Sequence, residues 1–148
     1  MQIWYAAALL LGGLNLAAGA TLPVGSPLRS FLGILLFLSI AAVLVLAGRE
    51  ARRAALRPSW QGALAGICYA VPSGLVAVLF PPTLAELTAE LRRSHATSYQ
   101  LQAAALSDTP AAHWSGFMIG VVVFAVLGLV AGWVGSFFGR QRDESGAM

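Results

Sequence analysis

The chain has 148 residues, of which 58% are hydrophobic and only 10% are charged, whereas a soluble domain is about 25% charged. Because so few charged residues could not form the surface of a soluble domain, we exclude a soluble globular protein. We expect one membrane-embedded domain, residues 1–148. The net charge of +3 comes from nine arginines and no lysine, and the arginines lie at the ends of apolar runs. That distribution is typical of membrane topology signals, and we expect no nucleic-acid partner.

Four apolar segments are long enough to cross a hydrocarbon core of about 30 Å, which takes roughly 20 helical residues. They are residues 3–22, 31–48, 60–80 and 114–138. None of the four contains Asp, Glu, Lys, Arg or His. Tryptophans lie near their ends, as expected where a ring with one polar group meets the membrane interface: Trp4, Trp60, Trp114 and Trp133. The sequence therefore predicts an all-α membrane protein with four transmembrane helices.

The first segment, MQIWYAAALLLGGLNLAAGA, also has features of a secretory signal peptide, because LAAGA resembles a small-residue cleavage site. It lacks the basic residues that precede the apolar run in such signals. Its apolar run is also as long as a membrane span. We interpret it as a retained span, with a removed signal peptide as the alternative.

The segments that join the spans alternate in basic charge. REARRAALRPS, between the second and third spans, contains four arginines, and the tail GRQRDESGAM adds Arg140 and Arg142. The first loop contains only Arg29, and the third only Arg92 and Arg93. The positive-inside rule therefore predicts that both termini lie in the cytoplasm and that the first and third loops face the other side.

The third loop begins with PPTLAELTAELRR and is patterned as a helix. Pro81 and Pro82 end the third span, because proline cannot continue a helical hydrogen-bond ladder. Thr83 and Glu86 fit a capping box, in which two side chains satisfy free backbone N–H groups. Leucines follow on one face and charged residues on another, which predicts one extracytoplasmic amphipathic helix over residues 83–106. We expect it to pack on its own bundle or on a neighbouring subunit, with lipid contact as the alternative.

The start of the fourth helix is predicted from Thr109 and Pro110. Threonine is a common N-cap residue, and proline is favoured in the first helical turn. The helix therefore begins before its apolar run, which starts near Trp114.

Glycines at four-residue spacing recur in the third and fourth spans. Small residues at this spacing allow two helix backbones to approach closely inside a membrane. We predict six packing positions: Gly62, Gly66, Gly116, Gly120, Gly128 and Gly132. Contacts within the bundle and contacts with a partner both fit this pattern, and we favour contacts within the bundle.

The third span has a proline at mid-depth, in CYAVPSG. Pro72 cannot donate to the carbonyl of Cys68, which predicts a kink. We predict a small polar cluster beside it, consisting of Asn15, Ser39, Tyr69 and Ser73. A ligand or gating site at a broken helix fits this cluster. A structural hydrogen bond between helices is the simpler interpretation, because no ionisable acid or base accompanies it.

Few residues are candidates for catalysis or ligand binding. Cys68 lies in an apolar segment, where a thiol is usually inert. His95 lies in the polar third loop, where we interpret it as a solvated side chain. His113 beside Trp114 is the one candidate for a metal or cofactor at the interface, although an interfacial anchor is the simpler interpretation. We therefore expect a non-catalytic protein with no metal and no cofactor.

Two closely spaced spans, a helix that continues into FPPTLAELTAELRR, a glycine-rich span and a basic tail form the layout of the chain. This layout resembles small bacterial four-span integral membrane proteins of unknown function. The resemblance covers nearly the whole chain, implies location in a bacterial inner membrane and supplies no residue roles.

The leading hypothesis is an accessory or structural subunit of a larger membrane complex, which docks through the fourth span and the outer helix. The alternative is a small oligomeric channel or transporter component with a kinked third span. A membrane enzyme is the least favoured class. Expected partners are the lipid bilayer and either other membrane subunits or a second copy of the chain.

Overall fold

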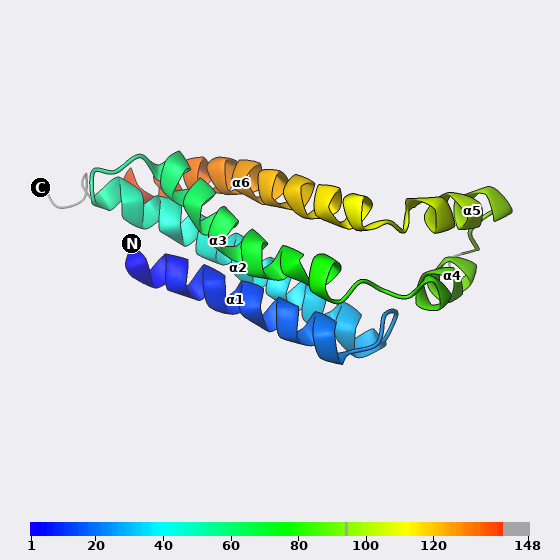
Figure 1. Cartoon of the computed structure of the whole chain (residues 1–148). Helices are drawn as coiled ribbons and strands as arrows, with labels where there is room; N and C mark the ends of the chain where they lie inside the picture. Colours follow the sequence, from blue (N-terminus) through cyan, green and yellow to red (C-terminus); the bar gives the residue numbers. More distant parts are fainter. Residues whose placement is uncertain (94, 141–148) are drawn as a thin grey trace, which may run out of the picture.

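The computed structural model describes residues 1–93 and 95–140, and these residues form six helices and no strand. The helices are α1 (Gln2–Thr21), α2 (Pro27–Arg53), α3 (Pro58–Leu79), α4 (Leu84–Arg93), α5 (Ser98–Ser107) and α6 (Pro110–Arg140). The four long helices lie side by side, and α4 and α5 project beyond one end of them (Figure 1). We call this end the hairpin end. The opposite end, which contains the arginine-rich α2–α3 connection and the N-terminus, is the basic end.

All four long helices are long enough and apolar enough to cross a membrane, which confirms the four predicted spans. The chain therefore has the features of a multi-pass membrane protein. The helices extend past the apolar runs: α6 has 31 residues, about 46 Å at 1.5 Å per residue, whereas the hydrocarbon core is about 30 Å thick. The terminal turns of α6 therefore reach beyond the hydrocarbon.

Polar side chains cap the starts of two of the long helices, α2 and α6. The Ser26 hydroxyl accepts from the Arg29 backbone N–H at 3.2 Å, and Pro27 follows at the first position of α2. The Thr109 hydroxyl accepts from the Ala112 N–H, also at 3.2 Å, which confirms the predicted start of α6. These caps satisfy backbone N–H groups that have no partner within the helix.

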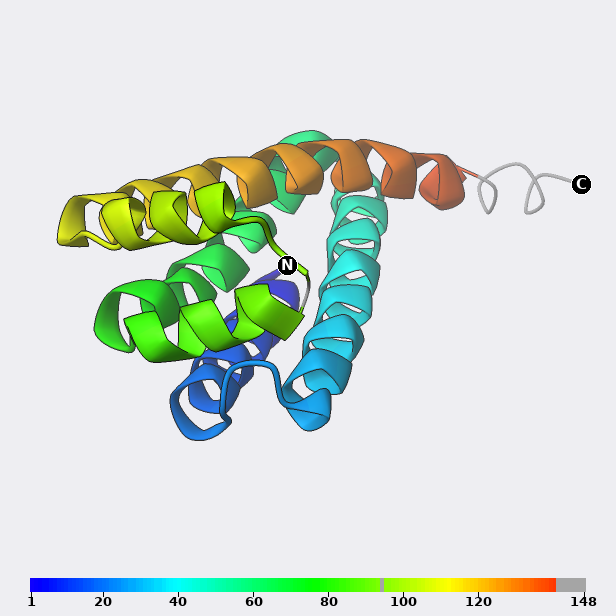
Figure 2. The ribbon, with the colours of Figure 1, turned by 90° about the vertical axis from the view of Figure 1, so that its right-hand side faces the viewer.

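α2 and α3 each pack against the other three long helices, and the contact between α3 and α6 is the most extensive in the bundle. Viewed from the hairpin end, α6 crosses over α3 and α2 while α1 lies on the far side of α3 (Figure 2). The buried core is small and rich in alanine: Ala8, Ile40, Leu44, Ala47, Ala65 and Tyr69. Most large apolar side chains instead point outward, where lipid solvates them.

The predicted single helix over residues 83–106 is wrong, because the segment forms two shorter helices, α4 and α5. His95 has a φ of 57°, a left-handed conformation that interrupts a right-handed helix. Thr97 then starts a new helix with its own capping box, in which its N–H donates to the Gln100 side chain at 2.8 Å. This T-x-x-Q pattern, a second capping box after that of Thr83 and Glu86, is visible in the sequence. α4 and α5 contact each other and, as a helical hairpin, stand clear of the long helices (Figure 1).

Candidate functional site

The half of α6 nearer the basic end (residues 124–140, the basic half) is wedged between α2 and α3 at glycine contacts. A Cβ atom added to Gly62 of α3 would lie 2.9 Å from the Gly132 Cα and would collide with the Gly128 carbonyl oxygen. A Cβ atom on Gly48 of α2 would meet the backbone of the same Gly132. Gly66 faces the Phe124 backbone in the same way. Glycine is required here because backbones of three helices occupy the space that a side chain would need.

The other half of α6 (residues 110–123, the hairpin half) has a different environment. A Cβ atom on Gly116 or Gly120 would meet no heavy atom within 4 Å. This half of α6 contacts α3 through the Phe117 ring. A Cβ atom added to Gly74 of α3 would lie 2.7 Å from the Phe117 Cδ2. Of the six predicted packing glycines, four therefore lie at contacts within the bundle, and Gly116 and Gly120 lie on an open surface.

The structure brings Asn15 and Ser73 together. The Asn15 Nδ2 donates to the Ser73 Oγ at 2.7 Å, which joins α1 to α3. One turn away, a Cβ atom on Gly12 would lie 2.6 Å from the Pro72 Cγ, so the proline ring is in close contact with α1. The polar groups of Asn15 and Ser73 thus satisfy each other at a tightly packed seam between the two helices.

Two other residues of the predicted polar cluster make different contacts. The Tyr69 ring is 5% exposed and packs against Phe124 of α6, with ring centroids 4.8 Å apart. The Ser39 hydroxyl donates to the Leu35 carbonyl of its own helix at 2.8 Å. Of these four described residues, therefore, a hydrogen bond joins only Asn15 and Ser73.

Sequence reasoning missed the packing surface of α1. Ala8 is completely buried, Gly12 contacts Tyr69 and Pro72, and a Cβ atom on Gly19 would meet the Val76 side chain. The signal was present in the spacing, because Ala8, Gly12, Asn15 and Gly19 follow the i, i+4, i+7, i+11 pattern of one helix face. A further hydrogen bond between α1 and α3 joins the Tyr5 hydroxyl to the Gln61 side-chain oxygen.

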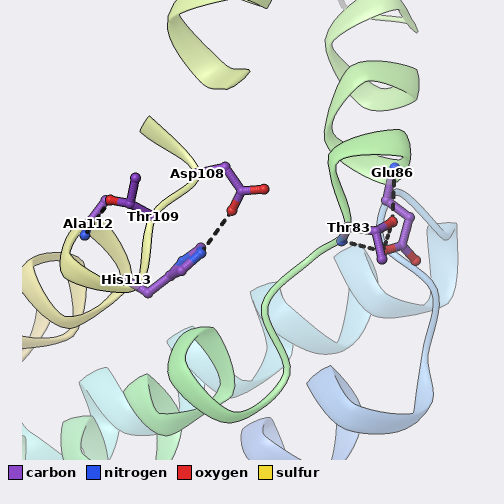
Figure 3. Close-up of polar contacts among 6 residues, drawn as sticks. All are labelled: Thr83, Glu86, Asp108, Thr109, Ala112 and His113. Carbon is purple, nitrogen blue, oxygen red and sulfur yellow. Dashed lines mark hydrogen bonds and ion pairs between the residues drawn. The ribbon is translucent and has the colours of Figure 1, made fainter. Parts of the chain in front are cut away.

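The cysteine and the two histidines lie apart, and His113 has a clear partner. Its Nε2 lies 2.9 Å from an Asp108 carboxylate oxygen, across the turn between α5 and α6 (Figure 3). His95 is exposed at the break between α4 and α5, and the Cys68 thiol is half-buried in α3. Within residues 1–93 and 95–140, no three His, Cys, Asp or Glu side chains are grouped so that they could hold a metal ion.

A pocket of about 380 Å³ lies at the hairpin end, between the ends of α1 and α3 and the starts of α2 and α4. Two oppositely charged side chains line it, Arg29 and Glu86. The Arg29 Nη1 donates to the Leu22 carbonyl at 3.2 Å. The N–H and hydroxyl of Thr83 both donate to the Glu86 carboxylate at 2.9 Å, which confirms the predicted capping box (Figure 3).

The charge state of Glu86 follows from these contacts. The backbone N–H of Thr83, and then its hydroxyl, hold the pKa of the Glu86 carboxyl below its ordinary value, and the positive charge of Arg29 lowers it further. Each favours the carboxylate form, so Glu86 is ionised at neutral pH. The sequence alone did not predict this pocket, because Arg29 of α2 and Glu86 of α4 are far apart in the chain and only the fold brings them together.

Comparisons of this chain with protein-family models, with curated proteins and with solved structures each gave no match. The resemblance to small four-span proteins therefore rests on layout alone, and the functional argument rests on the residues described above.

Proposed function

We propose that the protein is a non-catalytic accessory or structural subunit of a larger bacterial membrane protein complex. It docks through the hairpin half of α6 and through the helical hairpin, which we place on the extracytoplasmic side. The observation that supports this proposal is the open surface at Gly116 and Gly120, on the same helix whose other glycines are all used within the bundle.

Open glycines in the middle of a helix need a reason. Glycine lowers the stability of a helix by about 1 kcal/mol relative to alanine, since it loses more backbone freedom on folding. At Gly128 and Gly132 the close approach of α3 offsets that cost. At Gly116 and Gly120 a transmembrane helix of another subunit would do the same, because no other part of the described chain occupies the space beside these glycines.

The helical hairpin supplies the second part of the docking surface. α4 and α5 contact each other, and the extensive contacts of the bundle involve neither of them. Tyr99 is 77% exposed and Leu84 is 44% exposed. Exposed aromatic side chains are enriched in protein interfaces, because they bury a large area with few rotatable bonds.

The test is purification of the tagged protein from its own membrane in mild detergent, followed by native mass spectrometry. We expect the parent chain to arrive with other membrane subunits in fixed stoichiometry. Gly120→Leu should lose those subunits, whereas Gly33→Leu, which also places a side chain in open space, should keep them. Both variants should unfold at the parent temperature.

Two results would contradict the proposal. One is a parent protein that arrives alone or only as a homo-oligomer. The other is a Gly120→Leu variant that retains the same subunits as Gly33→Leu. Either would favour the alternative, a small oligomeric channel or transporter component, which we rank second because Asn15 and Ser73 beside Pro72 already satisfy each other. A change of solute flux on Asn15→Ala, with assembly unchanged, would support that alternative.

A further inference from the structure

The pocket at the hairpin end lies at the depth of lipid headgroups. It is bounded by the last turn of α1 and by the residues that directly follow α1 and α3, among them Leu22, Phe80 and Pro81. α1 and α3 are membrane-spanning segments, so their ends lie where hydrocarbon gives way to headgroups. The volume of about 380 Å³ is in the range of roughly 300–1,000 Å³ that is usual for small-molecule sites.

The turn between α1 and α2 holds the positive group in place. Gly25 has a φ of 76°, and the Ser26 N–H donates to the Pro23 carbonyl at 3.2 Å, so the chain reverses within a few residues. This reversal brings the half-buried Arg29 back over the end of α1, where one guanidinium nitrogen donates to Leu22. A guanidinium group has five N–H donors in all, and its planar fork matches the oxygens of a phosphate.

The negative group is held by the capping box of α4. Both Thr83 donors bind the Glu86 Oε2, and neither of them binds the Oε1. Although Arg29 and Glu86 line the same pocket, these two described side chains form no ion pair within 4 Å. Each therefore keeps capacity for a ligand, and the two opposite charges line the same pocket, one from α2 and one from α4.

We propose that this pocket binds the headgroup of phosphatidylethanolamine, with the phosphate against Arg29 and the ammonium against Glu86. The arrangement complements both charges of a zwitterion at once. Phosphatidylglycerol supplies the phosphate and has no cation for Glu86. Phosphatidylcholine supplies a cation without an N–H, so it cannot donate a hydrogen bond to the carboxylate.

A lipid is the source that fits the location best, because the acyl chains of a bound headgroup would lie along the apolar ends of α1 and α3. A free zwitterion of the same chemistry, such as glycerophosphoethanolamine, would lack that contact. The pocket shares α4 with the helical hairpin but includes no residue of α6, so the lipid test and the Gly120→Leu test of the docking proposal can fail independently.

The test is native mass spectrometry of the purified full-length protein with each of the three lipids, matched in acyl chains. We expect phosphatidylethanolamine to be retained about five- to tenfold more than the other two, the net effect of one ordinary hydrogen bond at a solvent-exposed carboxylate. Glu86→Gln should abolish that preference. Glutamine still completes a capping box, so this variant removes the charge and leaves the start of α4 intact.

Arg29→Gln should lower the retention of all three lipids, because each has a phosphate. The matched controls are Glu50→Gln and Arg53→Gln at the basic end, which should leave both the preference and the overall retention unchanged. Equal retention of the three lipids by the parent protein would overturn the proposal. The proposal would also fail if the preference for phosphatidylethanolamine persisted in Glu86→Gln. It would fail as well if glycerophosphoethanolamine displaced the bound lipid at equal concentration.

Discussion

The two halves of α6 have the same glycine spacing and opposite surroundings. In the basic half, Gly128 and Gly132 contact the backbone of α3, and a Cβ atom on Gly128 would lie 3.0 Å from the Ala63 Cα. In the hairpin half, Gly116 and Gly120 have open space around them. The spacing therefore indicates where a backbone can approach, and it does not indicate which helix approaches. In this chain the α3 backbone approaches the glycines of one half only, and the other half meets α3 through the Phe117 ring.

The largest expected effect comes from filling the closed half. Gly132→Leu should lower the free energy of unfolding by about 3 kcal/mol or more, because its side chain would displace the α3 backbone at Pro58 and Gly62. Gly116→Leu should change it by no more than about 0.5 kcal/mol. Reversible unfolding in detergent micelles measures both. Similar losses for the two variants would show that the halves of α6 are equally packed.

The same comparison can be made between neighbours on α1. Gly12→Ala should destabilise the protein by about 1–3 kcal/mol, since the new methyl group would overlap the Tyr69 carbonyl and the Pro72 ring. Gly13→Ala points into open space and should be neutral or slightly stabilising, because alanine is the better helix former. The free energy of unfolding of the two variants tests this difference. If Gly13→Ala were the more destabilising change, α1 would have to pack on α3 with a different face.

A smaller effect is expected from the polar contact between α1 and α3. Asn15→Ala should cost about 0.6 kcal/mol, the average for a hydrogen bond between membrane helices, and at most about 1.7 kcal/mol. A double-mutant cycle with Ser73→Ala isolates the interaction. If the two losses simply add, the hydrogen bond contributes nothing to the seam.

The smallest effect concerns the hairpin end and its dependence on pH. The Thr83 donors lower the Glu86 pKa in the folded state below the ordinary value of 4.5. The stabilisation they supply is therefore present above about pH 4.5 and is lost as the pH falls through the folded-state pKa. Thr83→Ala should raise the Glu86 pKa, as measured by carbon NMR of the carboxyl group. An unchanged pKa would mean that the capping box does not persist in solution.

Local signals made much of the fold predictable. The four spans follow from runs without charge, and the starts of α4 and α6 follow from Thr83 with Glu86 and from Thr109 with Pro110. These features depend on residues close in sequence, so they need no contact with other parts of the chain. The signal for the break between α4 and α5 is also local, the T-x-x-Q cap at Thr97, but the amphipathic pattern over residues 83–106 by itself predicts one helix.

The sequence by itself determined that the chain is helical, that four helices suit a membrane and where α4 and α6 begin, because hydropathy and capping act within one segment. Only the tertiary structure decided that Gly132 is closed and Gly116 open, that Asn15 meets Ser73, and that Arg29 and Glu86 share a pocket. Those facts depend on how helices rotate and cross. In a membrane, where lipid removes most of the hydrophobic drive between helices, that choice depends on small-residue contacts distributed over several helices.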